Sequence, residues 1–442
     1  MRILSTGEKI RQLRLDLGLN QEDLTNDEIT RSLISMIENN KRNLTYKTAK
    51  VLATTLNQYY QSLGKEITTD YLLESQAQQA ERLIKERLDD LQKHLNNPAP
   101  GNEIIMEDSF QKLIAFAQEW ELNDIIAQLI EARGKFYHTT FRYNEALKDY
   151  VTAQELYIKQ EKFDKVAYVY NLLGATYYYM EMHEQALVYY EQSNTILNTH
   201  YPNNYDRLKK LVCFNKIICH RQLKKFELVL SEINYFKSLS NHEDEVLNQV
   251  SIMEGNTYRD LGNYDKALKI YNRLLKKITK LSSETQLLLY DNYANLLYTR
   301  GSYEKCLDYV QLAFQHTYKS SPAYIAKLML LAAEASISLA YFDQAINYIN
   351  KGILLAETVN DTKIAIQLHL RFIKINLENH EYLVAERSLK KLEEFTEENE
   401  LKEQLNDIYS CLILLYSRVG EVDKCLDYSQ KMVGLRQIFA IK

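Results

Sequence analysis

Five basic side chains gather in one short segment near the amino-terminal end of the sequence. Residues 29–50 contain five Lys or Arg and a single acid, Glu38, so the local charge is +4. Such a cluster attracts a polyanion, and a guanidinium can also bridge O6 and N7 of a guanine. The segment is therefore a candidate for contact with double-stranded DNA, and the alternative is a solvated basic face on a helical bundle. The five cations are Arg31, Lys41, Arg42, Lys47 and Lys50.

The remaining sequence contains no pattern typical of a catalytic or metal site. The five cysteines form no CxxC pair, and the nine histidines show no HExxH spacing. No nucleophile triad, Gly-rich phosphate loop or pair of carboxylates fits a helical register. We therefore expect that the protein is not an enzyme and needs no cofactor. Unpaired cysteines also fit a reducing, cytoplasmic environment.

The composition predicts an all-α protein. Only 12 of 442 residues are Gly and 4 are Pro, which is too few for the turns of a sheet protein. The net charge is −5, yet residues 1–66 carry +2 and the remaining 376 residues carry −7, so only a local patch can attract DNA. No signal sequence opens the chain, and the longest apolar run, residues 328–333, is too short to cross a bilayer. We expect neither export nor contact with a membrane.

A motif with a small residue recurs at intervals of 38–43 residues. Twelve residues before it stands a second small residue, such as Gly134 or Gly255, and four residues after it a large one, such as Tyr150 or Tyr271. Helices that approach closely need small residues at the contact, so the motif predicts pairs of packed helices. The recurring positions are Ala146, Ala186, Val229, Ala267, Cys306, Ala345, Ala385 and Cys425.

This motif resembles the tetratricopeptide repeat, whose helix pairs stack into a right-handed superhelix. The resemblance extends over about residues 122–442 and implies about eight helix pairs. The third copy departs from it, with Ile217 and Val229 at the small positions. The 34 tyrosines are then expected to be mostly core residues of the repeats.

Residues 5–60 are expected to form short helices, each preceded by a capping residue. The order and spacing of these helices resemble the Cro/C1-type helix-turn-helix of phage repressors and Xre regulators. Asn40 stands where that family usually has Gly, a change that costs little because Asn tolerates the left-handed conformation. The acidic pair at residues 27 and 28 lies less favourably near phosphate. The expected caps are Ser5 with Glu8, Asn20, Thr30 and Thr45.

The helix-turn-helix resemblance implies which side chains contact DNA. Arg31, Ser32 and Met36 would face base edges in the major groove, while Gln21 and Asn43 would contact phosphate. Arg31 is the strongest candidate, because a bidentate guanine contact contributes about 1–3 kcal/mol of discrimination. The full set of predicted DNA-binding residues is Gln21, Thr30, Arg31, Ser32, Met36, Lys41, Arg42 and Asn43.

A single linker helix is expected over residues 70–95. Its apolar residues follow three- and four-residue steps, from Leu73 through Ile84 to Leu95, and this stripe must be buried. It can pack on the first repeats of its own chain or pair with a second copy. Helix-turn-helix modules usually bind two half-sites, which favours a homodimer. The predicted domains are residues 1–66 for DNA binding, 67–101 for the linker and 102–442 for the repeats.

The first helix of each pair would line a concave groove. Asn suits an extended peptide there, because its amide can donate to and accept from the main chain at once. Arg221 or Arg259 could hold a peptide carboxylate. Alternatively these polar residues only keep the groove solvated. The predicted peptide-binding residues are Lys135, His138, Asn171, Tyr178, Asn215, Arg221, Asn256, Arg259, Asp291, Asn292, Asn295 and Tyr298, with Ile252 beside them.

The complete domain order resembles the RRNPP family of peptide-pheromone receptors of Gram-positive bacteria, in particular its PlcR- and NprR-like members. The resemblance implies a cytoplasmic, dimeric quorum-sensing transcription regulator. It would bind operator DNA through the helix-turn-helix and respond to a short signalling peptide in the repeat groove. The alternative is a repeat-based adaptor or anti-activator of the Rap kind, which binds a protein partner and has little affinity for DNA.

Overall fold

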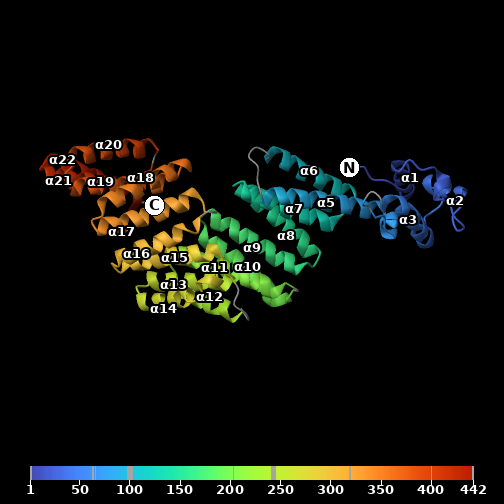
Figure 1. Ribbon diagram of the computed structural model, residues 1–442, viewed down its shortest axis with the longest axis horizontal. Helices are drawn as coiled ribbons and strands as arrows, with labels where there is room; N and C mark the ends of the chain where they lie inside the picture. Colours follow the sequence, from blue (N-terminus) through green and yellow to red (C-terminus); the bar gives the residue numbers. More distant parts are fainter. Residues whose placement is uncertain are drawn as a thin grey trace. The chain divides into compact units, whose positions relative to one another are not determined.

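The computed structural model describes residues 2–61, 64, 66–96, 103–202, 204–239, 245–317, 320–399 and 401–440. Within these ranges all regular elements are helices, which confirms the all-α prediction (Figure 1). The chain forms two compact units, Met1–Leu223 and Lys224–Lys442. Among the described residues, no helix combines the length and apolar character that a bilayer crossing requires.

The amino-terminal bundle closes around one apolar cluster. Ile10, Leu24, Ile34 and Leu52 are almost fully buried in it, and so is Leu72, so the bundle core continues beyond residue 66. The bundle elements are α1 (Thr6–Asp16), the 3-10 helix η1 (Gln21–Leu24), α2 (Arg31–Glu38), α3 (Tyr46–Tyr60) and α4 (Thr69–Leu73).

Three of the four predicted caps form as side-chain hydrogen bonds, and at Asn20 only the backbone N donates, to Asp23 Oδ2 at 2.6 Å. Ser5 and Glu8 make the capping box of α1, and the hydroxyls of Thr30 and Thr45 accept from Leu33 N and Thr48 N. The helix expected from residue 21 is only one 3-10 turn. Thr25 leaves the helical conformation and donates its hydroxyl to Glu22 O, so a local side-chain bond replaces the next helical turn.

Asn40 ends α2 in the left-handed conformation expected from the sequence, with φ of 56°. Its side chain has an additional role, because Oδ1 accepts from Gly7 N at 3.2 Å and Nδ2 donates to Ser5 Oγ at 2.8 Å. The turn after α2 is therefore tied to the start of α1.

The expectation of one helix over residues 70–95 is wrong. The chain leaves α4 at Glu74, whose ψ is 123°, and α5 (Gln76–Asn96) begins one residue after Ser75. Ser75 Oγ accepts from Gln78 N while Gln78 Oε1 accepts from Ser75 N, so a capping box starts a new helix here. This box is visible in the sequence as Ser-x-x-Gln.

Helix α5 packs on its own chain rather than leaving its apolar stripe for a partner. Ile84 and Leu88 are buried in the cluster that contains Phe110 and Phe136, and α5 contacts both α6 (Glu103–Glu119) and α7 (Asn123–Thr139). Of the two alternatives for the linker stripe, the structure supports packing on the first repeats. Helix α5 thus forms an additional helix pair with α6, and its stripe gives no support to a dimer.

The repeats form the remainder of both units as antiparallel helix pairs. The first unit continues with α8 (Tyr143–Lys159), α9 (Phe163–Tyr179), α10 (His183–His200) and α11 (Tyr205–Gln222). The second contains α12 (Phe226–Ser238), α13 (Glu245–Asp260), α14 (Tyr264–Leu275), the 3-10 helix η3 (Ile278–Lys280), α15 (Ser283–Thr299), α16 (Tyr303–Phe314), α17 (Pro322–Ser338), α18 (Phe342–Thr358), α19 (Thr362–Glu378), α20 (Tyr382–Glu398), α21 (Lys402–Val419) and α22 (Val422–Ala440).

The small residues of the motif lie where two helices of a pair meet. A Cβ on Gly134 would lie 2.7 Å from Cε1 of Tyr150, and one on Gly174 would lie 2.5 Å from Cε1 of Tyr190. The rings of Tyr150 and Tyr190 therefore occupy the space that a side chain would need. This contact explains why a small residue and an aromatic residue recur together at sixteen-residue spacing.

Candidate functional site

Helix α2 presents the predicted base-reading residues at one exposed end. Arg31 and Ser32 are exposed, and Met36 is half-buried one turn further along. Lys41, Arg42 and Asn43 follow α2 and are all exposed. Thr30 is exposed too, but its hydroxyl caps the helix by accepting from Leu33 N at 3.3 Å. The structure therefore brings together seven of the eight predicted residues on and beside this helix.

Two of the basic side chains near α2 pair with acids that precede α2 in the chain, one in η1 and one in the turn after it. Arg31 Nη1 lies 2.7 Å from Glu22 Oε1, with the two side chains 66% and 69% exposed. Lys47 Nζ lies 2.8 Å from Glu28 Oε2. Pairs this exposed are weakly held, so phosphate can compete for both cations.

Gln21, the eighth residue, takes part in a buried network instead of projecting freely. Its Nε2 donates to Glu38 Oε2 at 2.8 Å, and Glu38 also accepts from Arg14 Nε and Nη2 at 2.7 and 2.9 Å. Burial raises the pKa of the Glu38 carboxyl, but the hydrogen bonds from Arg14 and Gln21 outweigh this effect and hold the pKa below its ordinary value. This network fixes η1 against α2.

A second network fastens the bundle to α5. The Lys9 ammonium, 1% exposed, donates to Tyr71 O at 2.8 Å and lies 3.2 Å from Glu74 Oε2. Glu74 also accepts from Arg82 of α5 at 2.9 Å, and Gln79 Oε1 accepts from Leu4 N at 3.0 Å. Burial lowers the pKa of Lys9, and the Glu74 carboxylate opposes that effect.

The predicted residues Lys135 and His138 line a cavity of about 380 Å³. Gln92 of α5 and Tyr168 of α9 also line this cavity. Lys135 Nζ lies 2.5 Å from Glu131 Oε1 and 4.8 Å from the Tyr168 ring centre. Burial lowers the Lys135 pKa, but Glu131 and Tyr168 outweigh burial and raise it.

His138 is held by its neighbours in the same part of the first unit. Its Nδ1 lies 3.1 Å from the hydroxyl oxygen of Thr176, and its ring meets that of Tyr179 edge-on. Burial lowers the pKa of His138, so the imidazole is neutral at pH 7. It can therefore donate or accept one hydrogen bond from the wall of the cavity.

The other predicted residues of the first unit form a polar ladder between α9 and α11. Asn215 Nδ2 donates to Asn171 Oδ1 at 2.8 Å, and Gln222 Nε2 donates to Tyr178 OH at 3.1 Å. Asn171 is 4% exposed, yet its own N–H groups form no hydrogen bond with a described residue. Arg221 is half-buried on α11.

In the second unit the predicted residues divide into buried and accessible ones. Asn256 is buried and accepts from Tyr271 OH at 2.5 Å, so its carbonyl oxygen points to α14. Asp291 is also buried and accepts from Tyr324 OH and Asn295 Nδ2, each at 2.8 Å. Burial raises the pKa of Asp291, while Tyr324 and nearby Lys327 and Arg259 oppose the rise.

The accessible residues of the second unit keep hydrogen-bonding capacity. Asn292 donates to Leu288 O at 2.7 Å, and its carbonyl oxygen has no partner among the described residues. Arg259 lies 2.9 Å from Asp260, and Tyr298 is half-buried beside Tyr303.

Ile252, which was expected beside these residues, is 3% exposed and belongs to the core.

Sequence reasoning missed Gln92 and Tyr168 in the first unit and Tyr324 in the second. Gln92 lies in the predicted linker, and only the packing of α5 on α7 brings it to Lys135. Tyr168 and Tyr324 occupy no recurring position of the repeat motif. The spacing of the motif therefore gave no signal for them.

Comparison with protein families identifies both parts of the chain. A helix-turn-helix domain family matches residues 7–74. Two tetratricopeptide repeat families match residues 126–198 and 249–276. No curated protein matches the sequence significantly.

Several solved structures align with most of the chain. The apo form of RapI has 13% identity and a TM-score of 0.55, and the match covers 81% of this chain and 98% of RapI. PlcR of Bacillus thuringiensis, bound to the peptide PapR7 and DNA, has 14% identity, a TM-score of 0.37 and coverages of 82% and 98%. The apo quorum sensor NprR from B. thuringiensis has 13% identity, a TM-score of 0.44 and coverages of 98% and 100%.

The likeness to RapI shows a shared repeat fold, and the family matches assign the amino-terminal bundle. Together they agree with the resemblance to RRNPP regulators stated from the sequence. The chain is a protein with an amino-terminal helix-turn-helix domain followed by tetratricopeptide repeats.

Proposed function

We propose that the protein is a cytoplasmic, quorum-sensing transcription regulator that binds operator DNA through α2 and is switched by a short signalling peptide. One observation carries the proposal. Gln92 of α5 lines the same cavity as Lys135 and His138, and the other end of α5 is bonded to the helix-turn-helix bundle through Gln79 and Arg82. A molecule in this cavity would therefore touch the helix that carries the DNA-binding bundle.

The DNA side of the proposal rests on the exposure of α2. Arg31 and Ser32 stand at the amino-terminal end of this helix, where a major groove would meet them, and Lys41 and Arg42 can approach phosphate. The bundle is small, so two copies on two half-sites would supply the affinity. A homodimer remains part of the proposal, through a surface other than the buried stripe of α5.

The peptide side of the proposal rests on amide groups with unused capacity in each unit. In the first unit Asn171 keeps its N–H groups, and in the second Asn292 and Asn295 keep their carbonyl oxygens. For each unit taken by itself, a peptide main chain offers the matching partner, a C=O for the N–H groups of Asn171 or an N–H for the oxygens of Asn292 and Asn295. Such contacts bind an extended peptide with little dependence on its side chains.

The switch would act along α5. From Gln92 to Gln79 a helix spans about 20 Å, since the rise is about 1.5 Å per residue. A peptide changes DNA binding only if it binds two arrangements of the protein with different affinity, and a difference of about 1–3 kcal/mol is typical of such coupling.

The test begins with selection of duplexes from a random DNA pool by the full-length protein. Affinity for the selected duplex is then measured for the wild type, for Arg31→Ala and for Arg87→Ala, an exposed arginine of α5 outside the bundle. We expect Arg31→Ala to lose about 1–3 kcal/mol of preference for the selected duplex over random DNA. Arg87→Ala should keep it.

The peptide response is measured on the same duplex in the presence of short synthetic peptides of random sequence. A peptide that changes the affinity of the wild type should lose its effect in Lys135→Ala. If no duplex is retained in a salt-dependent manner, the DNA-binding proposal fails, and an adaptor that binds a protein partner becomes the better explanation. If a duplex is retained but no peptide alters its affinity, only the switch fails.

A further inference from the structure

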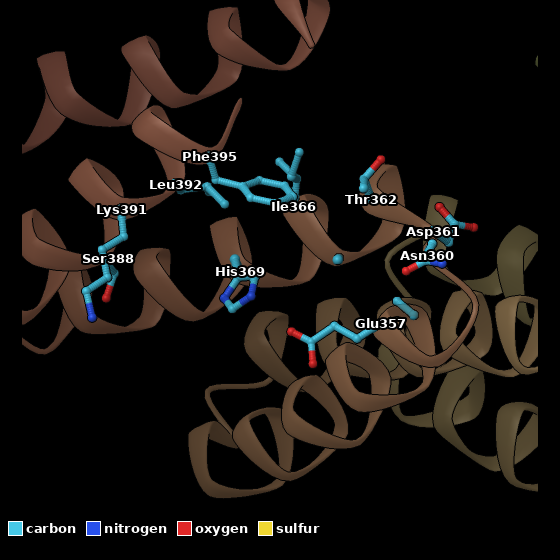
Figure 2. Close-up of a pocket in the computed structure, with 12 residues that line it drawn as sticks. Glu357, Asn360, Asp361, Thr362, Ile366, His369, Ser388, Lys391, Leu392 and Phe395 are labelled. Atoms are coloured by element: carbon cyan, nitrogen blue, oxygen red, sulfur yellow. The ribbon is translucent and has the colours of Figure 1, made fainter. Parts of the chain in front are cut away.

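A hollow on the second unit lies among helices that carry none of the predicted peptide-binding residues. Its volume is about 430 Å³, within the range of ligand-binding pockets, and α18, α19 and α20 enclose it (Figure 2). Ile366, Leu392 and Phe395 form an apolar wall, and the imidazole of His369 projects into the space below them. Glu357 faces the same space from α18.

The hollow lies where three other helix pairs have two tyrosine rings. In three other helix pairs a tyrosine on the first helix meets a tyrosine on the second, nineteen residues later. These couples are Tyr170 with Tyr189, Tyr290 with Tyr309, and Tyr409 with Tyr428, whose ring centres lie 6.4, 6.1 and 5.6 Å apart. Each couple fills the space between its two helices with two rings.

The pair α19–α20 lacks this couple. Its helices begin 79 residues after α15 and α16, at Thr362 and Tyr382 instead of Ser283 and Tyr303. At that offset His369 replaces Tyr290 and Ser388 replaces Tyr309. One small side chain and one imidazole thus stand where the earlier pair has two phenol rings, and both line the hollow.

The same comparison applies to the side of the hollow formed by α18. Helix α18 begins 78 residues after α14, and at that offset Ala356 is the residue that matches Ile278 in the sequence. Ile278 lies in η3, beyond the end of α14, and packs on the cluster around Tyr290. Ala356 lines the hollow too. Three residues of the hollow are thus smaller than the residues at the matching sequence positions of the earlier helix pairs.

Two partly buried polar side chains of the hollow, His369 and Ser388, have no hydrogen-bond partner among the described residues. Burial lowers the pKa of His369 and Glu357 opposes this effect, so the imidazole is neutral at pH 7 and can donate or accept. An occupant with an aromatic ring and one hydroxyl would match both the apolar wall and these two groups.

We propose that the hollow receives the side chain of a tyrosine from a partner polypeptide, whose ring takes the place of the missing intramolecular couple. The charges at the edge favour a polypeptide over a free phenol. Glu357 and Asp361 lie toward one end and exposed Lys391 toward the other, so a segment with a basic residue beside its tyrosine can pair with the acidic end. This site is independent of DNA binding and of the proposed peptide cavity.

The test measures binding of acetyl-Tyr-Lys-amide to the full-length protein by saturation-transfer NMR, with acetyl-Ala-Lys-amide as the matched peptide. We expect at least a tenfold preference for the tyrosine peptide. The double variant His369→Tyr/Ser388→Tyr rebuilds the couple from within the chain. It should lose at least tenfold in affinity for the tyrosine peptide and have a higher Tm, because it fills the hollow. Glu394→Tyr, an exposed position of α20 outside the hollow, should change neither quantity.

Equal binding of the two peptides by the wild type would overturn the proposal, and so would unchanged affinity in the double variant. If the double variant does not fold, Phe395→Ala tests the proposal instead. It removes part of the apolar wall, so it should weaken the binding of the tyrosine peptide and leave the binding of the alanine peptide unchanged. If the wild type self-associates and the double variant does not, the occupant is a second copy of the chain, and the assignment to a partner is wrong.

Discussion

Removal of the Glu38 carboxylate should loosen the amino-terminal bundle far more than removal of an exposed acid. Glu38 accepts from Arg14 at 2.7 and 2.9 Å, and the two side chains are 2% and 9% exposed. Glu38→Ala leaves the Arg14 guanidinium buried without its counter-ion. Breaking such a pair costs about 3–5 kcal/mol. Arg14 Nη1 keeps its bond to Leu19 O, so we expect about 3 kcal/mol.

The assay is hydrogen exchange of the full-length protein, followed by mass spectrometry of peptides from α1, α2 and α3. A loss of about 3 kcal/mol corresponds to roughly 100-fold faster exchange of their protected amides. Glu22→Ala is the matched control, since its pair with Arg31 is exposed and contributes about 0–1 kcal/mol. Repeat peptides should exchange as in the wild type. Equal protection of the bundle in Glu38→Ala and Glu22→Ala would refute the reasoning.

Two further predictions concern packing and pH. Gly174→Ala should destabilise the protein by about 1–3 kcal/mol, because the new Cβ would lie 2.5 Å from the ring of Tyr190. The control is Gly434→Ala, which should be neutral or stabilising because no atom lies within 4 Å of its new Cβ. Thermal unfolding of the two variants tests the prediction. The pKa values of Glu38 and Glu74 are lowered in the folded bundle, so the stability that these carboxylates contribute is present above about pH 4.5 and is lost as the pH falls through their folded values. The protection of the bundle amides against hydrogen exchange, corrected for the intrinsic rate of exchange, should therefore decrease when the pH is lowered below about 4.5. Protection that is unchanged down to pH 3 would contradict this account.

Local chemistry made much of the fold predictable. Ser5, Thr30 and Thr45 cap helices because their hydroxyls satisfy free N–H groups, and this preference does not depend on distant residues. The pairing of Gly134 with Tyr150 recurs along the chain, so repetition alone predicted close helix pairs. The break at Glu74 was predictable too, since Ser75 and Gln78 form a capping box, but the continuous apolar stripe outweighed it.

Contacts between distant segments account for the rest. Gln92 reaches the cavity of Lys135 only because α5 packs against α7, and a helical stripe does not show which surface covers it. The repeat spacing predicts that Asn256 faces the groove, but its side-chain carbonyl oxygen accepts a hydrogen bond from Tyr271 of α14 and lies in the core. The repeat motif did not predict the hollow beside His369. The relevant positions are those of Tyr290 and Tyr309, which the motif does not include, and they can be matched to His369 and Ser388 only when the helix pairs are aligned by their structure.

The buried ammonium of Lys9 also determines where the amino-terminal domain can be truncated. Its oxygen partners come from Tyr71 and Glu74, and Glu74 in turn pairs with Arg82, so a fragment that stops at residue 66 would lose these partners together with Ile67 and Leu72 of the bundle core. The smallest autonomous piece of the amino-terminal part consequently includes the first turns of α5. A fusion of this domain to another protein would therefore have to include the first turns of α5.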